Sequence, residues 1–242
     1  MRGGLAAASL FRVSEISARR SRSALVDAAA TAHAADMTFE STLAFLDLAG
    51  VLVFAVSGAL AAARKGMDIV GMFVLALVTS TGGGTLRSLL VGDLPVPFLR
   101  TPWLLVAALC ATLATFFAGR WIESRMERPI RFFDAIGLGV FTSTGMAIAL
   151  EIGQPWWSAL FLGCVTAVFG GVLRDVLRQE VPFVFQPAEL YATAALIGGI
   201  VFIVVHELGA PRPWTMVVGA SVAIAVRLVA MRRNWKTSTA VR

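Results

Sequence analysis

Ionisable side chains are scarce in this chain. Asp, Glu, Lys and Arg make up only 15% of its 242 residues, against 57% hydrophobic residues, and the mean hydropathy is +0.78. These values lie far from those of a soluble globular domain. Two cysteines and two histidines are too few for a disulfide framework or a histidine-based metal or acid–base centre. A glycine-rich phosphate-loop motif is also missing. The sequence therefore predicts no cofactor, no metal site and no enzyme.

The chain contains several long apolar runs. A membrane-spanning helix needs about 20 mostly apolar residues. The seven qualifying segments are 43–63, 69–87, 103–119, 133–150, 156–174, 188–205 and 214–230. They are continuously apolar rather than alternating, which favours helices over a membrane barrel. We expect an all-α integral membrane protein with seven transmembrane helices.

Basic residues gather at one set of span ends. The net charge of +6 reflects arginines and lysines that flank the spans, so it does not indicate a nucleic-acid partner. The basic clusters follow the first, third, fifth and seventh spans, and basic loops stay in the cytoplasm. The N-terminus is therefore predicted outside and the C-terminus, with the basic tail 232–242, inside. Residues 1–36 are rich in Ala and Ser, and we interpret them as a disordered extension or as a start codon assigned too early.

A shift of 87 residues superimposes one half of the chain on the other without a gap. It carries Gly58 to Gly145, Thr79 to Thr166, Arg87 to Arg174 and Pro95 to Pro182. The chain thus contains two copies of a three-span unit, 43–120 and 132–206, followed by a seventh helix at 213–231. Because three is odd, the second copy enters the membrane from the opposite side. The result is a 3+3 inverted repeat plus one helix, an arrangement typical of solute or ion paths.

The middle span of each copy contains consecutive glycines. Each glycine costs a helix about 0.8–1.0 kcal/mol relative to alanine. We therefore expect the second and fifth helices to kink or break there, with freed carbonyls lining a water-filled path. The alternative is close packing of helices through small residues. The predicted path residues are Thr79, Ser80, Thr81, Gly82, Gly83, Gly84, Thr166, Gly170 and Gly171.

Each copy also places a carboxylate and an arginine inside its spans, where charges are costly and are paired or functional. The predicted pairs are Asp47 with Arg87 near the outer face and Asp134 with Arg174 near the cytoplasmic face. They are either structural ion pairs or gates at the two mouths of a path. Asp175 adds an acid to the second copy where the first has Ser88, so the two mouths differ electrically.

The two copies resemble a known membrane family in VTSTGGGTLRSLLVGDLPVPF and FGGVLRDVLRQEVPFVF. The resemblance is to bacterial proteins built from two glycine-transporter domains, which are similar in fold to trimeric intracellular cation (TRIC) channels. It covers residues 43–230. It implies kinked second and fifth helices, a homotrimer with one pore per protomer, and either potassium conduction or glycine uptake. The family usually has Arg-Asp in both copies, whereas the first copy here reads Arg87-Ser88.

Three functions are compatible with these observations. The first is a potassium channel of the bacterial inner membrane, because hydroxyl and carbonyl oxygens suit a dehydrated monovalent cation. The alternative is a small amino-acid transporter, with glycine the candidate, because helix ends also suit a zwitterion. A non-transporting scaffold or membrane enzyme is the third, but no nucleophile–base set is present. The expected partners are membrane lipid, a small ion or amino acid, and two further copies of the chain.

Overall fold

The computed structural model describes residues 36–118, 127–186 and 190–235, which fall in two compact units, Met1–Thr42 and Leu43–Arg242. All side chains of the candidate site belong to the second unit. The predicted extension 1–36 lies outside the described residues except for its last residue. The basic tail 232–242 lies outside them from residue 236 onward.

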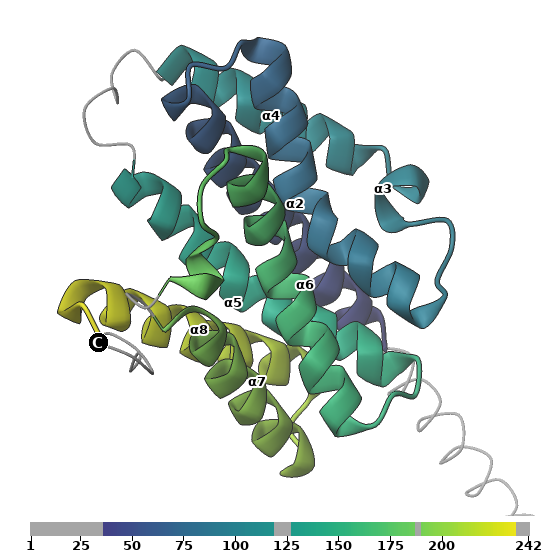
Figure 1. Ribbon diagram of the computed structural model, residues 1–242. Coiled ribbons are helices and arrows are strands. Elements are labelled where there is room, and N and C mark those ends of the chain that lie inside the picture. The colour runs from purple at the N-terminus through teal and green to yellow at the C-terminus, as the bar shows by residue number, and fades with distance from the viewer. Residues whose placement is uncertain (1–35, 119–126, 187–189, 236–242) are drawn as a thin grey trace, which may run out of the picture. The chain divides into compact units, whose positions relative to one another are not determined.

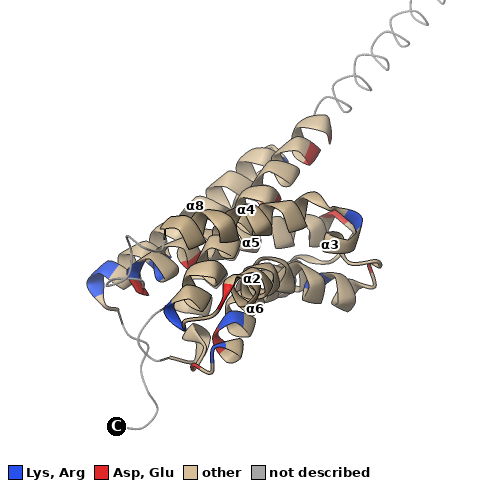
Figure 2. Cartoon of the chain, turned by 90° about the horizontal axis from the view of Figure 1, so that it is seen from above, with Lys and Arg blue, Asp and Glu red and all other residues tan. Residues whose placement is uncertain are grey.

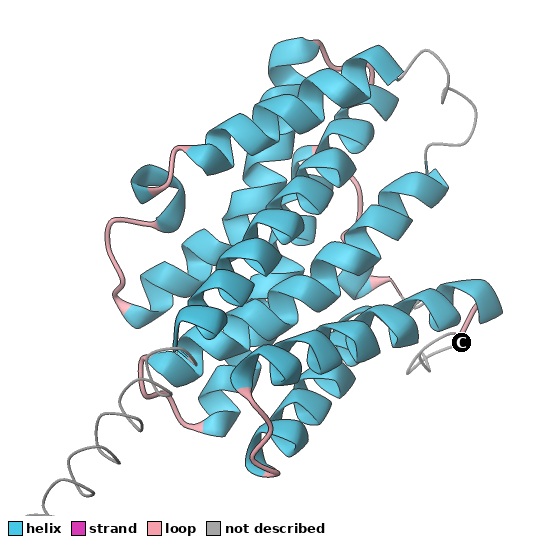
Figure 3. Ribbon diagram, turned by 180° about the vertical axis from the view of Figure 1, so that it is seen from behind, coloured by secondary structure: helices cyan, strands magenta, loops and turns pink. Residues whose placement is uncertain are grey.

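Helices and loops account for the described residues, as Figures 1 and 3 show. The first helix spans Asp36–Arg64. The others are α2 (Ile69–Val91), α3 (Pro97–Arg100), α4 (Trp103–Ala118), α5 (Glu127–Glu151), α6 (Trp156–Leu177), the 3-10 turn η2 (Phe183–Phe185), α7 (Tyr191–Glu207) and α8 (Arg212–Arg233). A helix occupies the position of every predicted span, so the all-helical prediction is confirmed.

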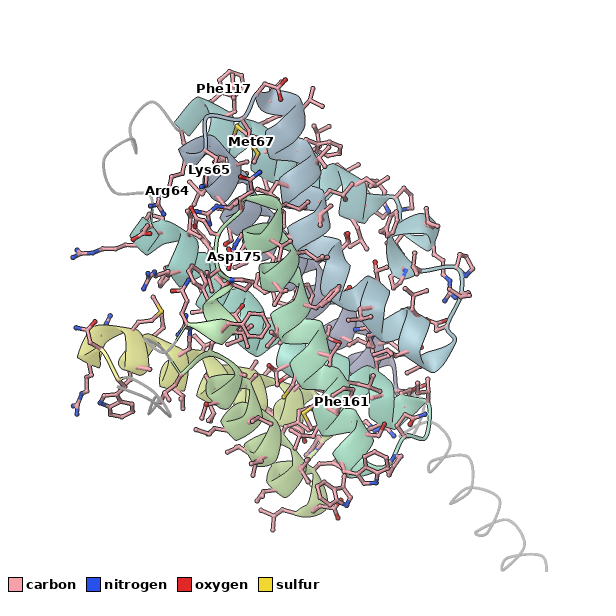
Figure 4. The ribbon with its side chains drawn as sticks, viewed as in Figure 1. Arg64, Lys65, Met67, Phe117, Phe161 and Asp175 are labelled. Atoms are coloured by element: carbon pink, nitrogen blue, oxygen red, sulfur yellow. The ribbon has the colours of Figure 1, made fainter. Side chains whose placement is uncertain are left out.

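Among the described residues, five helices are long and apolar enough to cross a membrane. They are Asp36–Arg64, Ile69–Val91, Glu127–Glu151, Trp156–Leu177 and Arg212–Arg233, while Trp103–Ala118 and Tyr191–Glu207 are shorter apolar helices. Charged positions are sparse along the helices (Figure 2). Large apolar side chains point outward instead, such as Phe117 at 71% and Phe161 at 60% exposure, both labelled in Figure 4. An outer surface of this kind suits lipid rather than water.

Local sequence explains where α2 begins and ends. Asp68 caps its first turn by accepting a hydrogen bond of 2.8 Å from the Gly71 amide. At the other end Gly92 adopts φ 74°, a left-handed conformation that glycine takes without strain. These two residues fix the length of the helix that carries the first glycine run.

Helix α5 forms the centre of the second unit and packs against α6, α7 and α8. Helix α2 packs against α6, α4 and α3 on the other side. Buried apolar residues of the first helix, α5 and α6 form one core cluster, within which Phe54 and Phe141 stack edge to face with ring centroids 5.2 Å apart. The packing places the two glycine-containing helices, α2 and α6, against each other.

Candidate functional site

The glycine runs lie where α2 and α6 cross. A Cβ added to Gly83 would overlap the Thr166 carbonyl oxygen, and one added to Gly170 would overlap the Thr79 carbonyl oxygen. The contact is reciprocal, because Thr166 lies 87 positions after Thr79 and Gly170 lies 87 after Gly83. All four residues are buried. Two helix backbones therefore touch directly at this crossing, as small residues permit.

The expected break at the glycines is wrong. Helix α2 runs unbroken from Ile69 to Val91 and α6 from Trp156 to Leu177. In a membrane an interrupted helix leaves N–H and C=O groups without partners, at a cost of several kcal/mol for each group. That cost exceeds the roughly 1 kcal/mol by which a glycine disfavours a helix. The helices thus stay continuous, and the glycines serve close packing, the alternative that the sequence also allowed.

Two further pairs of contacts follow the same reciprocity. A Cβ on Gly58 would lie 2.7 Å from Thr79 Oγ1, and one on Gly145 would lie 2.9 Å from Thr166 Oγ1. A Cβ on Gly50 would meet the Phe141 ring, and one on Gly137 would overlap the Phe54 ring. We name these last two contacts the glycine–phenylalanine joint. Positions that match in sequence therefore make matching contacts in space.

Arg174 holds together a fully buried charge cluster at one end of α6. Its Nη1 donates to Asp134 Oδ1 at 2.6 Å and to Ser57 Oγ at 2.7 Å, and its Nε donates to Asp175 Oδ1 at 2.9 Å. The side chains of the three charged residues are at most 1% exposed. The predicted meeting of Asp134 and Arg174 is thus present, and Asp175 joins it. Such charges are tolerated without water because each finds an opposite charge and hydrogen bonds.

Aromatic groups close this cluster. The Tyr191 hydroxyl donates to Asp134 Oδ1 at 3.2 Å. The Arg174 guanidinium lies 4.9 Å from the centre of the Phe183 ring, and the Phe183 amide donates to Asp175 Oδ2 at 3.2 Å. Arg227 of α8 lies over the Tyr191 ring at 4.9 Å. The cluster therefore ties the first helix, α5, α6, η2 and α7 together.

A second set of ion pairs leads from this cluster to the surface. Arg178 Nη1 lies 3.4 Å from Asp175 Oδ1, and Arg178 Nη2 lies 2.7 Å from Glu180 Oε2. Glu180 Oε1 also pairs with Lys65 Nζ at 3.1 Å. Figure 4 shows Lys65 and Asp175 toward the same end of the structure, with Phe161 toward the other end of α6. We name the Lys65, Arg178 and Glu180 group the surface latch, because it joins the end of the first helix to the end of α6.

Charge interactions in the surface latch lower the pKa of Glu180. Partial burial alone would raise that pKa, but the hydrogen bond from Lys65 and the positive charges of Arg178, Lys65 and Arg64 outweigh it. The pKa of Glu180 therefore lies below its ordinary value, and the ionised form is the stable one in the folded protein.

The first copy lacks an equivalent cluster. Arg87 is only 5% exposed, yet its Nε and Nη1 atoms are buried without a hydrogen-bond partner. The neighbouring Ser88 Oγ is likewise buried and unpartnered. Asp47 lines the same pocket as Arg87, but the structure shows no ion pair between them. The sequence-predicted pair is thus brought into one pocket without direct contact.

This Arg87 pocket lies between the first helix, α2, α3, α4 and α5, and leaves about 20 Å³ for the centre of a water-sized sphere. Its lining residues are Asp47, Val51, Ser80, Thr81, Gly84, Thr85, Arg87, Pro97, Phe98, Leu104 and Phe141. The hydroxyls of Ser80 and Thr81 both donate to the Leu77 carbonyl, at 3.1 and 2.7 Å, and Thr85 donates to the Thr81 carbonyl at 2.9 Å. Their remaining lone pairs can only accept, so the hydroxyls of this pocket suit a cation.

The predicted path residues therefore separate into four places. Ser80, Thr81 and Gly84 line the Arg87 pocket. Thr79, Gly83, Thr166 and Gly170 form the α2–α6 crossing, while Gly171 lies against Tyr191 and Asp134. Gly82 lines an adjoining apolar groove of about 380 Å³ with Leu77, Leu86 and Phe169. Within the described residues, no group of three His, Cys, Asp or Glu side chains is placed to hold a metal ion.

Sequence reasoning missed several members of these sites. Tyr191 lies beyond the quoted motifs, while Glu180 and Phe183 lie within the second motif but were not singled out. Arg178 had a signal, because it follows Asp175 by three residues on one helix face. Thr85 had one as well, because it follows Thr81 by four and lines the same pocket.

A family model described as "Glycine transporter" matches residues 44–120 and 131–207, which are the two halves found from the internal repeat. The chain belongs to the glycine transporter family. Curated members of this family include a UPF0126 membrane protein of Deinococcus radiodurans, 38% identical over 82% of this chain and 91% of its own length. Another is the UPF0126 inner membrane protein YadS of Escherichia coli K12, 35% identical over 81% of this chain and 94% of its own length. Like these glycine transporter family members, the chain is a multi-pass membrane protein.

Solved structures relate this glycine transporter family member to a channel fold. The TRIC trimeric intracellular cation channel orthologue from Rhodobacter sphaeroides is 38% identical, with a TM-score of 0.76 over 79% of this chain and 97% of that one. The family and the all-helical, TRIC-like membrane fold are therefore those that the sequence resemblance implied.

Proposed function

We propose that this protein is a monovalent-cation channel of TRIC type that conducts potassium across the bacterial inner membrane. The observation that carries the proposal is the Arg87 pocket, whose hydroxyl oxygens face inward as acceptors within a fold like that of a cation-channel orthologue. Three such chains form a homotrimer with one path in each protomer, by analogy with the trimeric channel that this chain is similar to.

The proposed architecture is seven membrane crossings in a 3+3 inverted repeat followed by α8. The reciprocal contacts of Gly83 with Thr166 and of Gly170 with Thr79 support it, because a two-fold axis produces such exchanged contacts. The N-terminus is outside and the C-terminus cytoplasmic. Lys65 and Arg178 meet in the surface latch, in agreement with two predicted basic clusters on one side of the membrane.

The proposed path enters at Asp47, passes Ser80, Thr81 and Thr85, and ends at the Arg174 cluster. Asp47 attracts cations to the mouth, and the hydroxyl oxygens replace part of their hydration shell. The α2–α6 crossing borders the path on one side. The Arg174 cluster closes the far end in this structure, because its aromatic and ion-pair contacts leave the side chains at most 1% exposed.

Glycine transport is the second candidate, and a different property of the same pocket favours it. Asp47 and Arg87 both line the pocket, so an ammonium group and a carboxylate each have a partner there. The family description also names glycine.

Proteoliposomes that contain the full chain separate the two functions. We expect potassium flux at zero glycine, driven by a potassium gradient, and no saturable uptake of radiolabelled glycine. Thr81→Val is expected to lower potassium flux, because it removes one acceptor from the pocket. Thr112→Val is the matched control, since Thr112 donates to Ala108 within α4 and lies outside the pocket. Saturable glycine uptake without potassium flux would replace the channel by the transporter.

A further inference from the structure

Arg87 is a buried charge that its surroundings leave incompletely satisfied. The side chain is 95% removed from solvent, and neither Nε nor Nη1 has a hydrogen-bond partner. A buried guanidinium without partners is unfavourable by several kcal/mol, so native proteins supply a counter-charge or a ligand. The orphaned N–H groups of a residue that lines a pocket therefore point to a binding function.

In the second copy, carboxylates of the chain itself satisfy the equivalent arginine. Arg174 has Asp134 and Asp175 within 2.9 Å, and Asp175 is the residue immediately after it. The equivalent position after Arg87 is Ser88, whose hydroxyl is buried and unpartnered. Replacement of one carboxylate by a hydroxyl thus removes one negative charge from the first site and leaves donors unused.

The chemistry of the Arg87 pocket restricts the missing partner to a small anion. Among the lining side chains, only Arg87 carries donors that are not already used within its own helix. The pocket leaves only about 20 Å³ for the centre of a water-sized sphere, which admits a small ion and excludes a large ligand. Asp47 faces the same space and restricts the negative charge of the ligand to one unit.

We infer that the Arg87 pocket binds one small monoanion, either a halide or a carboxylate. The anion accepts from Arg87 Nε, as Asp175 does from Arg174 Nε in the second copy, and also from Arg87 Nη1. The site itself does not depend on the proposed channel activity. If the channel proposal holds, the bound anion also neutralises Arg87 beside the cation path and lowers its repulsion of potassium.

The test measures thermal unfolding of the full chain in detergent micelles, with sodium HEPES replaced stepwise by sodium chloride at constant ionic strength. The expected result is an unfolding midpoint that rises with chloride and saturates. Ser88→Asp supplies the internal carboxylate of the second copy, so this variant is expected to lose at least 80% of the chloride-dependent shift. Glu151→Gln is the control and is expected to keep the shift, because Glu151 is exposed, pairs with Arg212 and is not among the charges that act on Arg87.

Acetate and glycine in place of chloride identify the source of the anion. Saturation by acetate and chloride alike assigns a free monoanion, whereas saturation by glycine alone assigns the carboxylate of a zwitterion held also by Asp47. A midpoint that responds to none of the three, or that responds equally in the Ser88→Asp variant, overturns the inference. Since this readout involves no flux, a failed channel assay leaves its outcome intact.

Discussion

Gly83 of α2 lies directly against the carbonyl oxygen of Thr166 in α6, with no room between them for a single methyl group. The reciprocal contact joins Gly170 to Thr79. Both helices continue without interruption through these contacts. The glycines therefore set the distance between two helices rather than interrupting either one.

Alanine at position 83 is expected to destabilise the protein, by contrast with alanine at position 84. The Gly83→Ala methyl group overlaps backbone that cannot rotate away, and overpacking of this kind costs about 1–3 kcal/mol. At Gly84 the added Cβ meets only Arg87 Nη2 at 3.8 Å, so Gly84→Ala is expected to be neutral or to gain up to about 1 kcal/mol of helix stability. Thermal unfolding in detergent measures both. Equal loss in the two variants would show that the close contact is not what the glycines provide.

Removal of the two buried arginines is expected to have unequal effects. Arg174→Met leaves Asp134 buried without a cation and Asp175 with only its longer pairing to Arg178, which costs about 3–5 kcal/mol. Arg87→Met removes a buried charge whose Nε and Nη1 have no hydrogen-bond partner, so in the absence of a bound anion it is expected to be neutral or to stabilise the fold. Denaturant or thermal unfolding of the two variants, compared in one detergent, decides the matter. A loss at Arg87 as large as that at Arg174 contradicts the electrical difference between the two sites.

Ser57 is expected to matter because it connects the first helix to the Arg174 cluster. Its hydroxyl accepts from Arg174 Nη1 at 2.7 Å and donates to the Ile130 carbonyl at 3.2 Å. Ser57→Ala removes a hydrogen bond to a charged group, so we expect a loss of about 1.5–3 kcal/mol. Ser158→Ala is the control, since Ser158 bonds only to Gln154 on the half-buried start of α6. Similar unfolding midpoints for Ser57→Ala and the native chain would remove Ser57 from the cluster.

Acid is expected to weaken the surface latch. Because the pKa of Glu180 is lowered in the folded protein, its contribution to stability is complete above its ordinary value of 4.5. The contribution is lost as the pH falls below 4.5 and through the folded-state pKa. Half-exposed ion pairs contribute about 1 kcal/mol or less, so the expected effect is small but specific.

Glu180→Gln isolates this effect, and Asp93→Asn is its matched control because Asp93 lies 87 residues earlier at the equivalent position. The unfolding midpoint of the native chain is expected to fall between pH 6 and pH 3.5 by more than that of Glu180→Gln. The Asp93→Asn variant is expected to follow the native chain. A native-like pH profile in Glu180→Gln would assign the acid response to other groups.

The positions of the helices and the meeting of Asp134 with Arg174 could be predicted from sequence. Hydrophobic length locates a membrane helix, and a repeat of constant spacing brings equivalent residues to equivalent places. The state of the glycines could not be predicted this way. Helix propensity favours a break at Gly82–Gly84, whereas the membrane's demand for paired backbone groups opposes it, and the second effect is larger.

The members of the buried cluster show a second limit of sequence reasoning. Tyr191 and Phe183 lie in the segment that follows α6, where they bond to Asp134 and Asp175. Neither residue stands at a sequence spacing that predicts these contacts. Whether Arg87 has a hydrogen-bond partner depends on side-chain distances inside the Arg87 pocket, which the sequence does not give. The sequence feature that pointed to it is Ser88, which stands where the second copy has Asp175.

The glycine–phenylalanine joint constrains how this protein moves. Phe54 lies against Gly137 while Phe141 lies against Gly50, so each half of the molecule packs a phenylalanine ring against a glycine of the other half. A sliding displacement of one helix along its neighbour would have to separate both contacts together, whereas rotation about the joint preserves them. We therefore expect any widening at the Asp47 end to be coupled to the arrangement at the Arg174 end.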